Sequence, residues 1–188
     1  SGCGRRADPM RVAIDATALG SNRGGDETLV RSLLRGLAGA VHQADAVEVL
    51  TSAGAQLPAE CRALAGAELR VTAIERRSGP RHFALDLPAW LRRLTHEGRR
   101  PDVVVSLTHA PVWSPAPVAL LVTDLSFIHD PGGYPAADRW RLRVLVGAQV
   151  RRAAQVLTIS DFCRPHPEQP HQPAAGRPHL LPLADAAP

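Results

Sequence analysis

The sequence predicts an α/β domain built on a parallel β-sheet with helices on both faces. Short apolar runs typical of buried strands alternate along the chain with segments of helical period. These runs show little alternation of polar and apolar residues, as expected of strands covered on both sides. Six such runs separated by helical segments favour parallel pairing, because each parallel connection must cross the sheet. In a sheet of this kind, ligands bind at the carboxyl ends of the strands.

The first strand lies within residues 10–16, and the first helix carries an apolar stripe through residues 29–37. Between them, Gly20, Gly24 and Gly25 permit positive φ angles and close approach of another group to the backbone. Free backbone N–H groups at a helix start can bind phosphate. Two interpretations stay open here, a tight structural turn and a phosphate or sugar site.

Dinucleotide and P-loop sites are poorly matched by this turn. The glycine spacing is not G-x-G-x-x-G, and no G-K-[ST] occurs. The second strand ends in Thr51 and Ser52, where a dinucleotide fold carries an acidic residue. A nucleotide-dependent oxidoreductase is therefore the weakest of the functions considered.

The remaining elements follow from the same periodicities. The other predicted strands are residues 46–52, 68–74, 103–105, 118–122 and 155–162, the last including a turn. The other predicted helices are residues 55–66, 82–98 and 135–153. In the second of these, Pro88 suits a first turn, so the helix proper is predicted to begin near Leu87. This helix combines arginines with Trp90 and could lie on a membrane surface, but packing of its apolar stripe on the sheet is favoured.

Composition narrows the class of protein and its organisation. The 188 residues carry a net charge of +4, all basic charge being arginine, and these arginines are scattered in pairs. We therefore expect no nucleic-acid binding. Three cysteines without a C-x-x-C favour a cytoplasmic protein with reduced thiols. We predict an unstructured leader over residues 1–9, one domain over 10–163, and a Pro-rich tail or linker over 164–188, in which residues 179–183 could form a last short strand.

Polar residues follow two of the predicted strands directly. Ser106, Thr108 and His109 come after the fourth strand, and a cluster from Thr123 to Asp130 comes after the fifth. His109 is either a site residue or a satisfied polar residue under a loop. Asp124 either takes a ligand or catalytic role, or it caps a helix or hydrogen-bonds within its loop. His129 and Asp130 favour turn chemistry over a metal pair, since no third ligand has suitable spacing, and no metal is expected.

Two stretches carry a family resemblance, VALLVTDLSFIHDP over 118–131 and VRRAAQVLTISDFCR over 150–164. They resemble the N-terminal domain of retaining GT-B glycosyltransferases of the family 4 type, which shows HDLSF before a proline, then paired arginines, then VLTVSEFSR. Gly24, Gly25 and Glu27 match the family's G-G-x-E turn. The resemblance covers residues 10–163 and, more weakly, 179–184. It implies a Rossmann-like sheet forming the N-terminal half of a GT-B fold.

The resemblance also implies roles for single residues. The family's glycine turn lies against the diphosphate of the sugar donor, which points to Gly24 and Gly25. Its loop after the fifth strand lines the sugar site, which points to Thr123 and to Asp124, the candidate catalytic residue. Thr123 stands where the family has a histidine that faces the transferred sugar. Acceptor binding by this domain makes His109 and His129 candidates.

The implied substrates are a nucleotide-diphosphate sugar and a glycan or lipid-linked acceptor, with no separate cofactor and with possible peripheral membrane contact. A second domain would supply the family's E-x7-E motif, which binds donor phosphates and is not expected within these residues. The chain alone is therefore expected to transfer little or no sugar. The alternative is a stand-alone, non-catalytic α/β binding module or a decayed remnant. The sugar, the acceptor and the oligomeric state are not specified by the sequence.

Overall fold

A computed structural model of the chain describes residues 9–20, 24–42, 45–59, 61, 67–75, 79–122, 135–158 and 179–180. Its elements in chain order are β1 (Arg11–Ala16), α1 (Gly24–Ala40), β2 (Ala46–Ser52), β3 (Glu68–Ile74), α2 (Gly79–Arg81), η2 (His82–Asp86), α3 (Leu87–His96), β4 (Val103–Leu107), β5 (Val118–Val122), α5 (Ala136–Arg152), β6 (Gln155–Thr158) and β7 (His179–Leu180). The strands form one seven-stranded sheet in the order β3-β2-β1-β4-β5-β6-β7. Every neighbouring pair is parallel, which confirms the predicted fold class.

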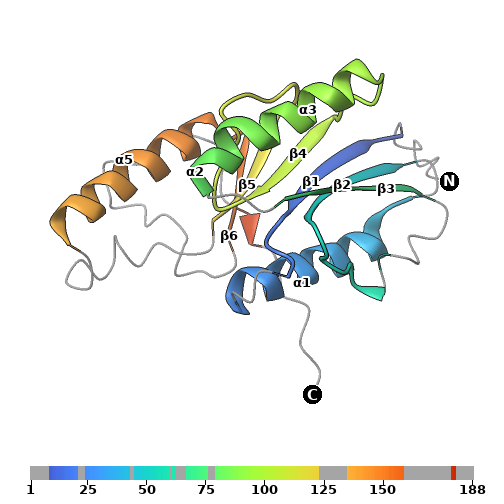
Figure 1. Cartoon of the computed structure of the whole chain (residues 1–188), viewed down its shortest axis with the longest axis horizontal. Helices are drawn as coiled ribbons and strands as arrows, with labels where there is room; N and C mark the ends of the chain where they lie inside the picture. Colours follow the sequence, from blue (N-terminus) through green and yellow to red (C-terminus); the bar gives the residue numbers. More distant parts are fainter. Residues whose placement is uncertain are drawn as a thin grey trace, which may run out of the picture.

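Helices cover both faces of this sheet (Figure 1). On one face, α1 packs through Val30 and Leu34 against strand residues such as Ile14 and Val49. On the other face, α3 packs against the sheet and α5 contributes Val150 at the edge of the same cluster. The two clusters use alternate residues of the central strands, because successive side chains of a strand point to opposite faces. The central strands are therefore largely apolar on both faces, as the sequence pattern indicated, although β1 and β2 also bury the carboxylates of Asp15 and Glu48.

Helix α3 shows why the packing interpretation of the arginine-rich segment is correct. Leu87, Trp90, Leu91 and Leu94 form its apolar stripe, and all four side chains are buried against the sheet. Full burial of each such side chain stabilises the fold by about 1.5–3 kcal/mol. Since this stripe is used in the core, the apolar face of α3 is not free to lie in a membrane. Among the described residues, no helix has the length and apolar character needed to cross one.

Several predicted boundaries agree with the structure and others do not. The second, third and fifth strands have the predicted bounds, and α3 begins at Leu87 as predicted. The predicted helix over 55–66 is wrong at its start, since residues 55–58 are not helical, and most of its remainder lies outside the described residues. The leader over 1–8 and most of the tail also lie outside them, apart from the short strand β7.

The glycines of the first turn divide into two kinds. Gly20 has φ +72°, a left-handed conformation that glycine adopts without strain. Gly24 and Gly25 instead form the first two residues of α1. All three glycines permit positive φ, but Gly25 does not use it. The first helical turn tolerates glycine there because its N–H groups have no intrahelical partner.

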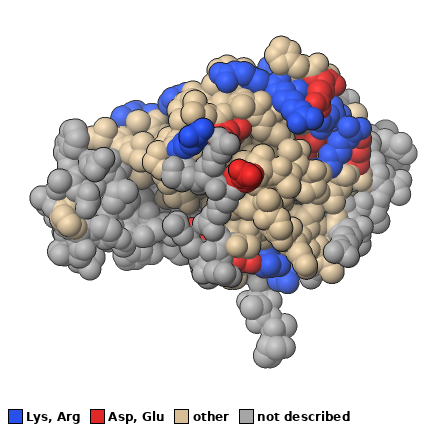
Figure 2. All heavy atoms as spheres, in the orientation of Figure 1, with Lys and Arg blue, Asp and Glu red and all other residues tan. Residues whose placement is uncertain are grey.

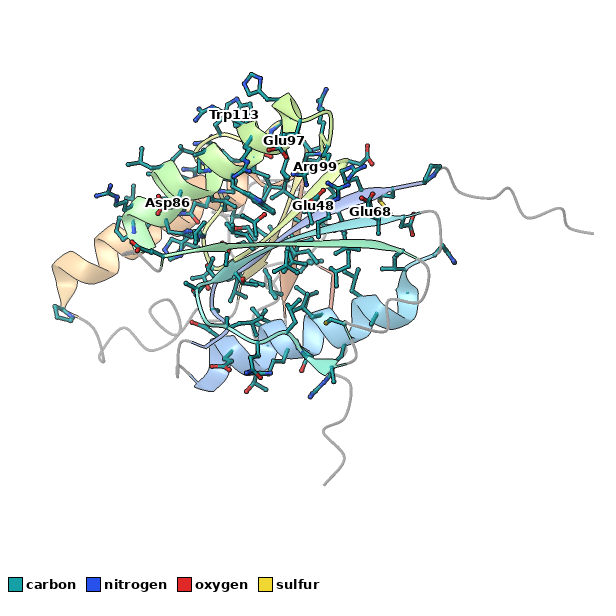
Figure 3. The ribbon with its side chains drawn as sticks, turned by 45° about the vertical axis from the view of Figure 1, so that its right-hand side comes forward. Glu48, Glu68, Asp86, Glu97, Arg99 and Trp113 are labelled. Carbon is teal, nitrogen blue, oxygen red and sulfur yellow. The ribbon has the colours of Figure 1, made fainter. Side chains whose placement is uncertain are left out.

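Charged side chains gather around the amino-terminal edge of the sheet. On the face shown in Figure 2, basic side chains lie mainly along the α3 side, with acidic ones among them at one end. In Figure 3, Glu48, Glu97 and Arg99 lie together at the opposite end of the sheet from Asp86. Glu48 is 1% exposed and binds Arg11 at 3.1 Å and Arg99 at 2.5 Å. Its hydrogen bond is the main reason that the pKa of Arg99 is raised. This group stabilises the fold and lies far along the strands from their carboxyl ends.

Candidate functional site

The order of the strands identifies one position in the sheet where ligands are expected. From β1 the chain proceeds outward to β2 and β3, then returns to the other side of β1 to form β4. The connections leaving β1 and β4 therefore diverge, and the carboxyl ends of these two strands form the topological switch point of the sheet. Their register pairs Ile14 with Val105, so Asp15 and Ser106 follow at the same level. The candidate site is built from the residues at this position.

Asp15 is a carboxylate within the apolar run 12–16 of β1 and is only 6% exposed. A buried charge is unfavourable unless it is paired and hydrogen-bonded. Its Oδ1 accepts hydrogen bonds from the Thr17 backbone N–H at 3.1 Å and the Thr17 hydroxyl at 2.7 Å. Its Oδ2 lies 2.8 Å from Nε2 of His82. The Thr17 carbonyl in turn accepts a bond from the Ser52 hydroxyl at 2.7 Å, which ties this turn to the end of β2.

His82 reaches the site from the helical segment before α3. It begins η2, a π-helical turn in which the Leu87 N–H bonds to the His82 carbonyl. Pro88 follows immediately at the start of α3. Proline has no N–H for the residue four positions earlier and its ring crowds that carbonyl, so a wider turn relieves the conflict. Single π-turns of this kind occur often at functional sites.

The hydrogen bond between Asp15 and His82 affects the titration of the histidine. Burial lowers the pKa of His82, but the hydrogen bond and charge of Asp15, with a contribution from Asp86, outweigh it and leave that pKa raised. With Asp15 as acceptor, the proton of the neutral ring resides on Nε2. Nδ1 of His82 then carries a lone pair, and no described residue hydrogen-bonds to it. An imidazole held in one tautomer by a buried carboxylate can accept a hydrogen bond or a proton from a hydroxyl group.

The second wall of the site is the turn that follows β4. Thr108 has φ +63°, an unusual conformation for a β-branched residue. The His109 N–H bonds to the Leu107 carbonyl at 2.6 Å across it, as in a γ-turn of the rare form with positive φ. The buried Ser106 hydroxyl donates to the His109 carbonyl at 2.5 Å and closes the turn. Strained turns of this kind persist where the surrounding structure holds them, often at ligand sites.

Replacement of Thr108 by glycine is expected to stabilise the fold by about 0.5–1 kcal/mol. Glycine removes the cost of about 1–2 kcal/mol for a left-handed L-residue but adds part of that cost back as lost chain entropy. Urea denaturation of the wild type and Thr108→Gly would measure it. As a control, Thr95→Gly inside α3 should destabilise the protein, since Thr95 is helical. A destabilised Thr108→Gly would contradict the presence of strain at this turn.

His109 lies partly buried beneath this turn and stacks on Phe83. The ring centroids are 4.9 Å apart with an angle of 10° between the planes. Burial is the main reason that the pKa of His109 is lowered, and the charge of His82 contributes in the same direction. The charges of Asp15 and of Asp26, in the first turn of α1, act against this shift. The pKa of His109 is therefore lowered, whereas the pKa of His82, which pairs with Asp15, is raised.

The two histidines should give opposite slopes of stability with pH. The lowered pKa of His109 means that the unfolded chain takes up its proton first, so stability is lost as pH falls below about 6.5. The raised pKa of His82 contributes stability that is present below about 6.5 and is lost as pH rises through its folded value. His109→Phe keeps a ring on Phe83 and should flatten the loss between pH 7 and 5.5, measured by urea denaturation. His82→Gln should steepen it, and equal slopes for both variants would contradict the assignment.

The residues predicted from the sequence divide into three groups. His109 follows β4, one of the two strands whose carboxyl ends form the switch point. Gly24 and Gly25 begin α1, whose first turn carries Asp26, a residue whose charge acts on His109; in the described part of the chain, a Cβ placed on Gly25 would meet no atom within 4 Å beyond its chain neighbours and the helix backbone. A final group lies outside the described residues, which end in this region at Val122: Thr123, Asp124, His129 and Asp130.

The expectation that the chain contains no E-x7-E spacing is wrong. The spacing does occur in the chain, between Glu60 and Glu68. Glu68, however, begins β3 at the amino-terminal edge of the sheet, where it is exposed and pairs with Arg70 at 2.5 Å. It therefore lies at the opposite end of the strands from the candidate site and does not serve as a donor-binding motif there.

Sequence reasoning missed Asp15, Thr17, His82 and Phe83. One signal was present, since Asp15 is the lone charged residue in the apolar run from Val12 to Ala16, and a buried carboxylate implies a partner. Nothing in the sequence indicates that this partner lies 67 positions away. Within the described part of the chain, no three His, Cys, Asp or Glu side chains come together in a way that could hold a metal ion.

Together these features define a doubly wound α/β domain with a polar, histidine-containing site at its switch point. Residues 24–184 match the family described as glycosyl transferase 4-like domain. The match spans most of the chain, so the chain belongs to this family, as its sequence motifs indicated. Membership supports glycosyl transfer in general as the activity. No curated protein matches the chain.

Proposed function

We propose that this chain forms the acceptor-binding half of a retaining glycosyltransferase, which moves a sugar from a nucleotide-diphosphate donor to a hydroxyl-bearing glycan or lipid-linked acceptor. The observation that carries the proposal is the assembly of Asp15, His82 and His109 at the switch point of a glycosyl transferase 4-like domain. Sites for small polar ligands combine a few fixed polar groups with flat apolar surface, and the Phe83–His109 stack supplies the latter.

The donor is assigned to the start of α1 and the loop after β5. Gly24 and Gly25 present backbone N–H groups at the positive end of the α1 dipole, which suits a diphosphate. In this proposal Thr123, Asp124 and His129 line the sugar site, and Asp124 is the candidate catalytic group. The oxidoreductase alternative is disfavoured, because β2 ends in Thr51 and Ser52 and the Ser52 hydroxyl is engaged by the Thr17 carbonyl.

The proposal is tested by ligand binding and transfer, measured on this chain and on a version that carries a second GT-B domain. Calorimetry with a panel of nucleotide-diphosphate sugars and methyl glycosides should show glycoside binding to the chain alone. Sugar transfer should require the second domain. Transfer by the chain alone would contradict the division of roles, and binding without transfer in both forms would favour the stand-alone binding module.

A surface beside α3 suits the lipid-linked form of the acceptor, with the protein peripherally bound to a membrane. Leu85, Val112 and Trp113 are exposed apolar residues, and the Arg92 guanidinium lies 4.7 Å from the centre of the Trp113 ring. Figure 2 shows basic side chains along this side, and Figure 3 shows Trp113 on the outer side of α3. Exposed tryptophan among arginines is typical of proteins that lie at an anionic interface.

Co-sedimentation should detect binding to vesicles that contain anionic phospholipid and weaker binding to zwitterionic vesicles. Arg92→Gln is expected to weaken anionic binding about fivefold, since each arginine near the surface contributes about 1 kcal/mol. Trp113→Ala should weaken binding to both kinds of vesicle. Val71→Ala, which removes an exposed apolar residue of the edge strand β3, is the matched control. If all three variants behave alike, this surface does not contact the membrane.

A further inference from the structure

We propose that His82 binds the acceptor directly, accepting a hydrogen bond from one of its hydroxyl groups at Nδ1, and that Asp15 and Thr17 position the imidazole for this contact. This assignment rests on the proposed function and goes further, because it names the contacting atom and the chemical class of the group bound.

Asp15 and Thr17 fix the orientation of the His82 ring. Nε2 of His82 is occupied by Asp15 at 2.8 Å, and Oδ1 of the same carboxylate is occupied by Thr17. The carboxylate therefore has a fixed orientation, since the Thr17 N–H and hydroxyl both require it as their acceptor. Fixing Asp15 fixes the ring, and a proton on Nε2 leaves Nδ1 as a pure acceptor.

The His82 side chain is more accessible to solvent than the carboxylate with which it pairs. It is 15% exposed, against 6% for Asp15. No described residue hydrogen-bonds to Nδ1. A histidine that served only to neutralise Asp15 would need one nitrogen, whereas this ring keeps a second polar atom available beside the Phe83–His109 stack.

Charge decides between a neutral and an anionic ligand group. Besides the two histidines themselves, the charged groups that act on His82 or on the neighbouring His109 are Asp15 from β1, Asp86 from η2 and Asp26 from α1, all acidic. The lowered pKa of His109 keeps that residue neutral beside them. At Nδ1 of the neutral His82 ring these carboxylates would repel a carboxylate or phosphate, while a hydroxyl donates to Nδ1 without cost in charge. The ligand group is therefore an uncharged alcohol of a sugar or polyol.

The experiment observes the imidazole nitrogens of the whole chain by ¹⁵N NMR while methyl α-glucoside, α-mannoside and α-galactoside are titrated. In the free protein, at a pH above the titration of its ring, His82 should show a proton on Nε2 and an unprotonated Nδ1. A glycoside that binds should shift the Nδ1 resonance of His82 along a saturation curve. His96, exposed at the end of α3, should not shift and serves as the internal control.

Asp15→Asn supplies the matched variant. The Asn oxygen is retained by Thr17, so its NH₂ faces Nε2, and the ring proton moves to Nδ1. Nδ1 of His82 then carries a proton and can no longer accept a hydrogen bond from the glycoside hydroxyl. Glycoside affinity should therefore fall about tenfold, equivalent to about 1.4 kcal/mol. A purely structural role for the pair predicts a change in stability with affinity unchanged.

Three outcomes would overturn the assignment, and they separate it from the proposed function. Glycoside binding seen at backbone amides with no shift at His82 Nδ1 rejects the role of His82 and leaves the acceptor-binding function standing. Unchanged affinity in Asp15→Asn, with the tautomer shown to have switched, rejects it in the same way. Failure of every glycoside to bind rejects both.

Discussion

Glu48→Gln, which lies away from the candidate site, is expected to lower the free energy of unfolding by about 2 kcal/mol. Glu48 is 1% exposed and accepts bonds from Arg11 and Arg99. Removing one partner of a fully buried ion pair costs about 3–5 kcal/mol. The expected loss is smaller here because the two guanidinium groups are partly exposed and can turn toward water.

Thermal unfolding would measure this loss as a fall of about 4–8 °C in midpoint, given the size of the chain. Glu97→Gln is the matched control. Glu97 contacts Arg93 and Arg99 at the surface, where ion pairs are screened, so its midpoint should move much less. Equal shifts for both variants would show that Glu48 contributes no more than a surface pair.

Asp15→Ala is expected to cost about 2–3 kcal/mol of stability, and Asp15→Asn about 1 kcal/mol. Alanine leaves the Thr17 N–H and the His82 Nε2–H without their acceptor at a position that is only 6% exposed, and each such group costs about 1–3 kcal/mol. Asparagine keeps an oxygen for Thr17 and loses the charge. Urea denaturation at several pH values would separate the two variants.

The pH dependence gives this prediction a second readout. Asp15 raises the pKa of His82, so their attraction stabilises the fold fully below about 6.5 and is lost as pH rises through the folded pKa. The difference in stability between wild type and Asp15→Ala should therefore be larger at pH 6 than at pH 8.5. A difference that grows with pH, or an alanine variant as stable as the asparagine one, would contradict the pairing.

Much of the fold was predictable because its signals are local. Buried parallel strands appear as short apolar runs, and the bounds of β2, β3 and β5 agree with those runs to the residue. The start of α3 at Leu87 was predictable because Pro88 is restricted to a first helical turn. The π-helical turn before it was not, since the same proline permits a simple helix start as well.

The candidate site was predictable only where its residues directly follow a strand. His109 directly follows a buried strand, so its place at the ligand-binding edge follows from the polarity of a parallel sheet. His82 lies within a helical segment, and helical period places it on a face without saying which strand that face meets. Its contact with Asp15 depends on how α3 crosses the sheet.

The amino-acid sequence by itself determined that this chain forms a parallel α/β sheet and that polar residues collect at the carboxyl ends of its strands. Both properties arise from periodicities of two to four residues, which act within each element. The tertiary structure decided the strand order, the position of the switch point between β1 and β4, and the union of Asp15 with His82 across 67 positions. These depend on which apolar faces pack together, and many different arrangements of elements satisfy the same local pattern.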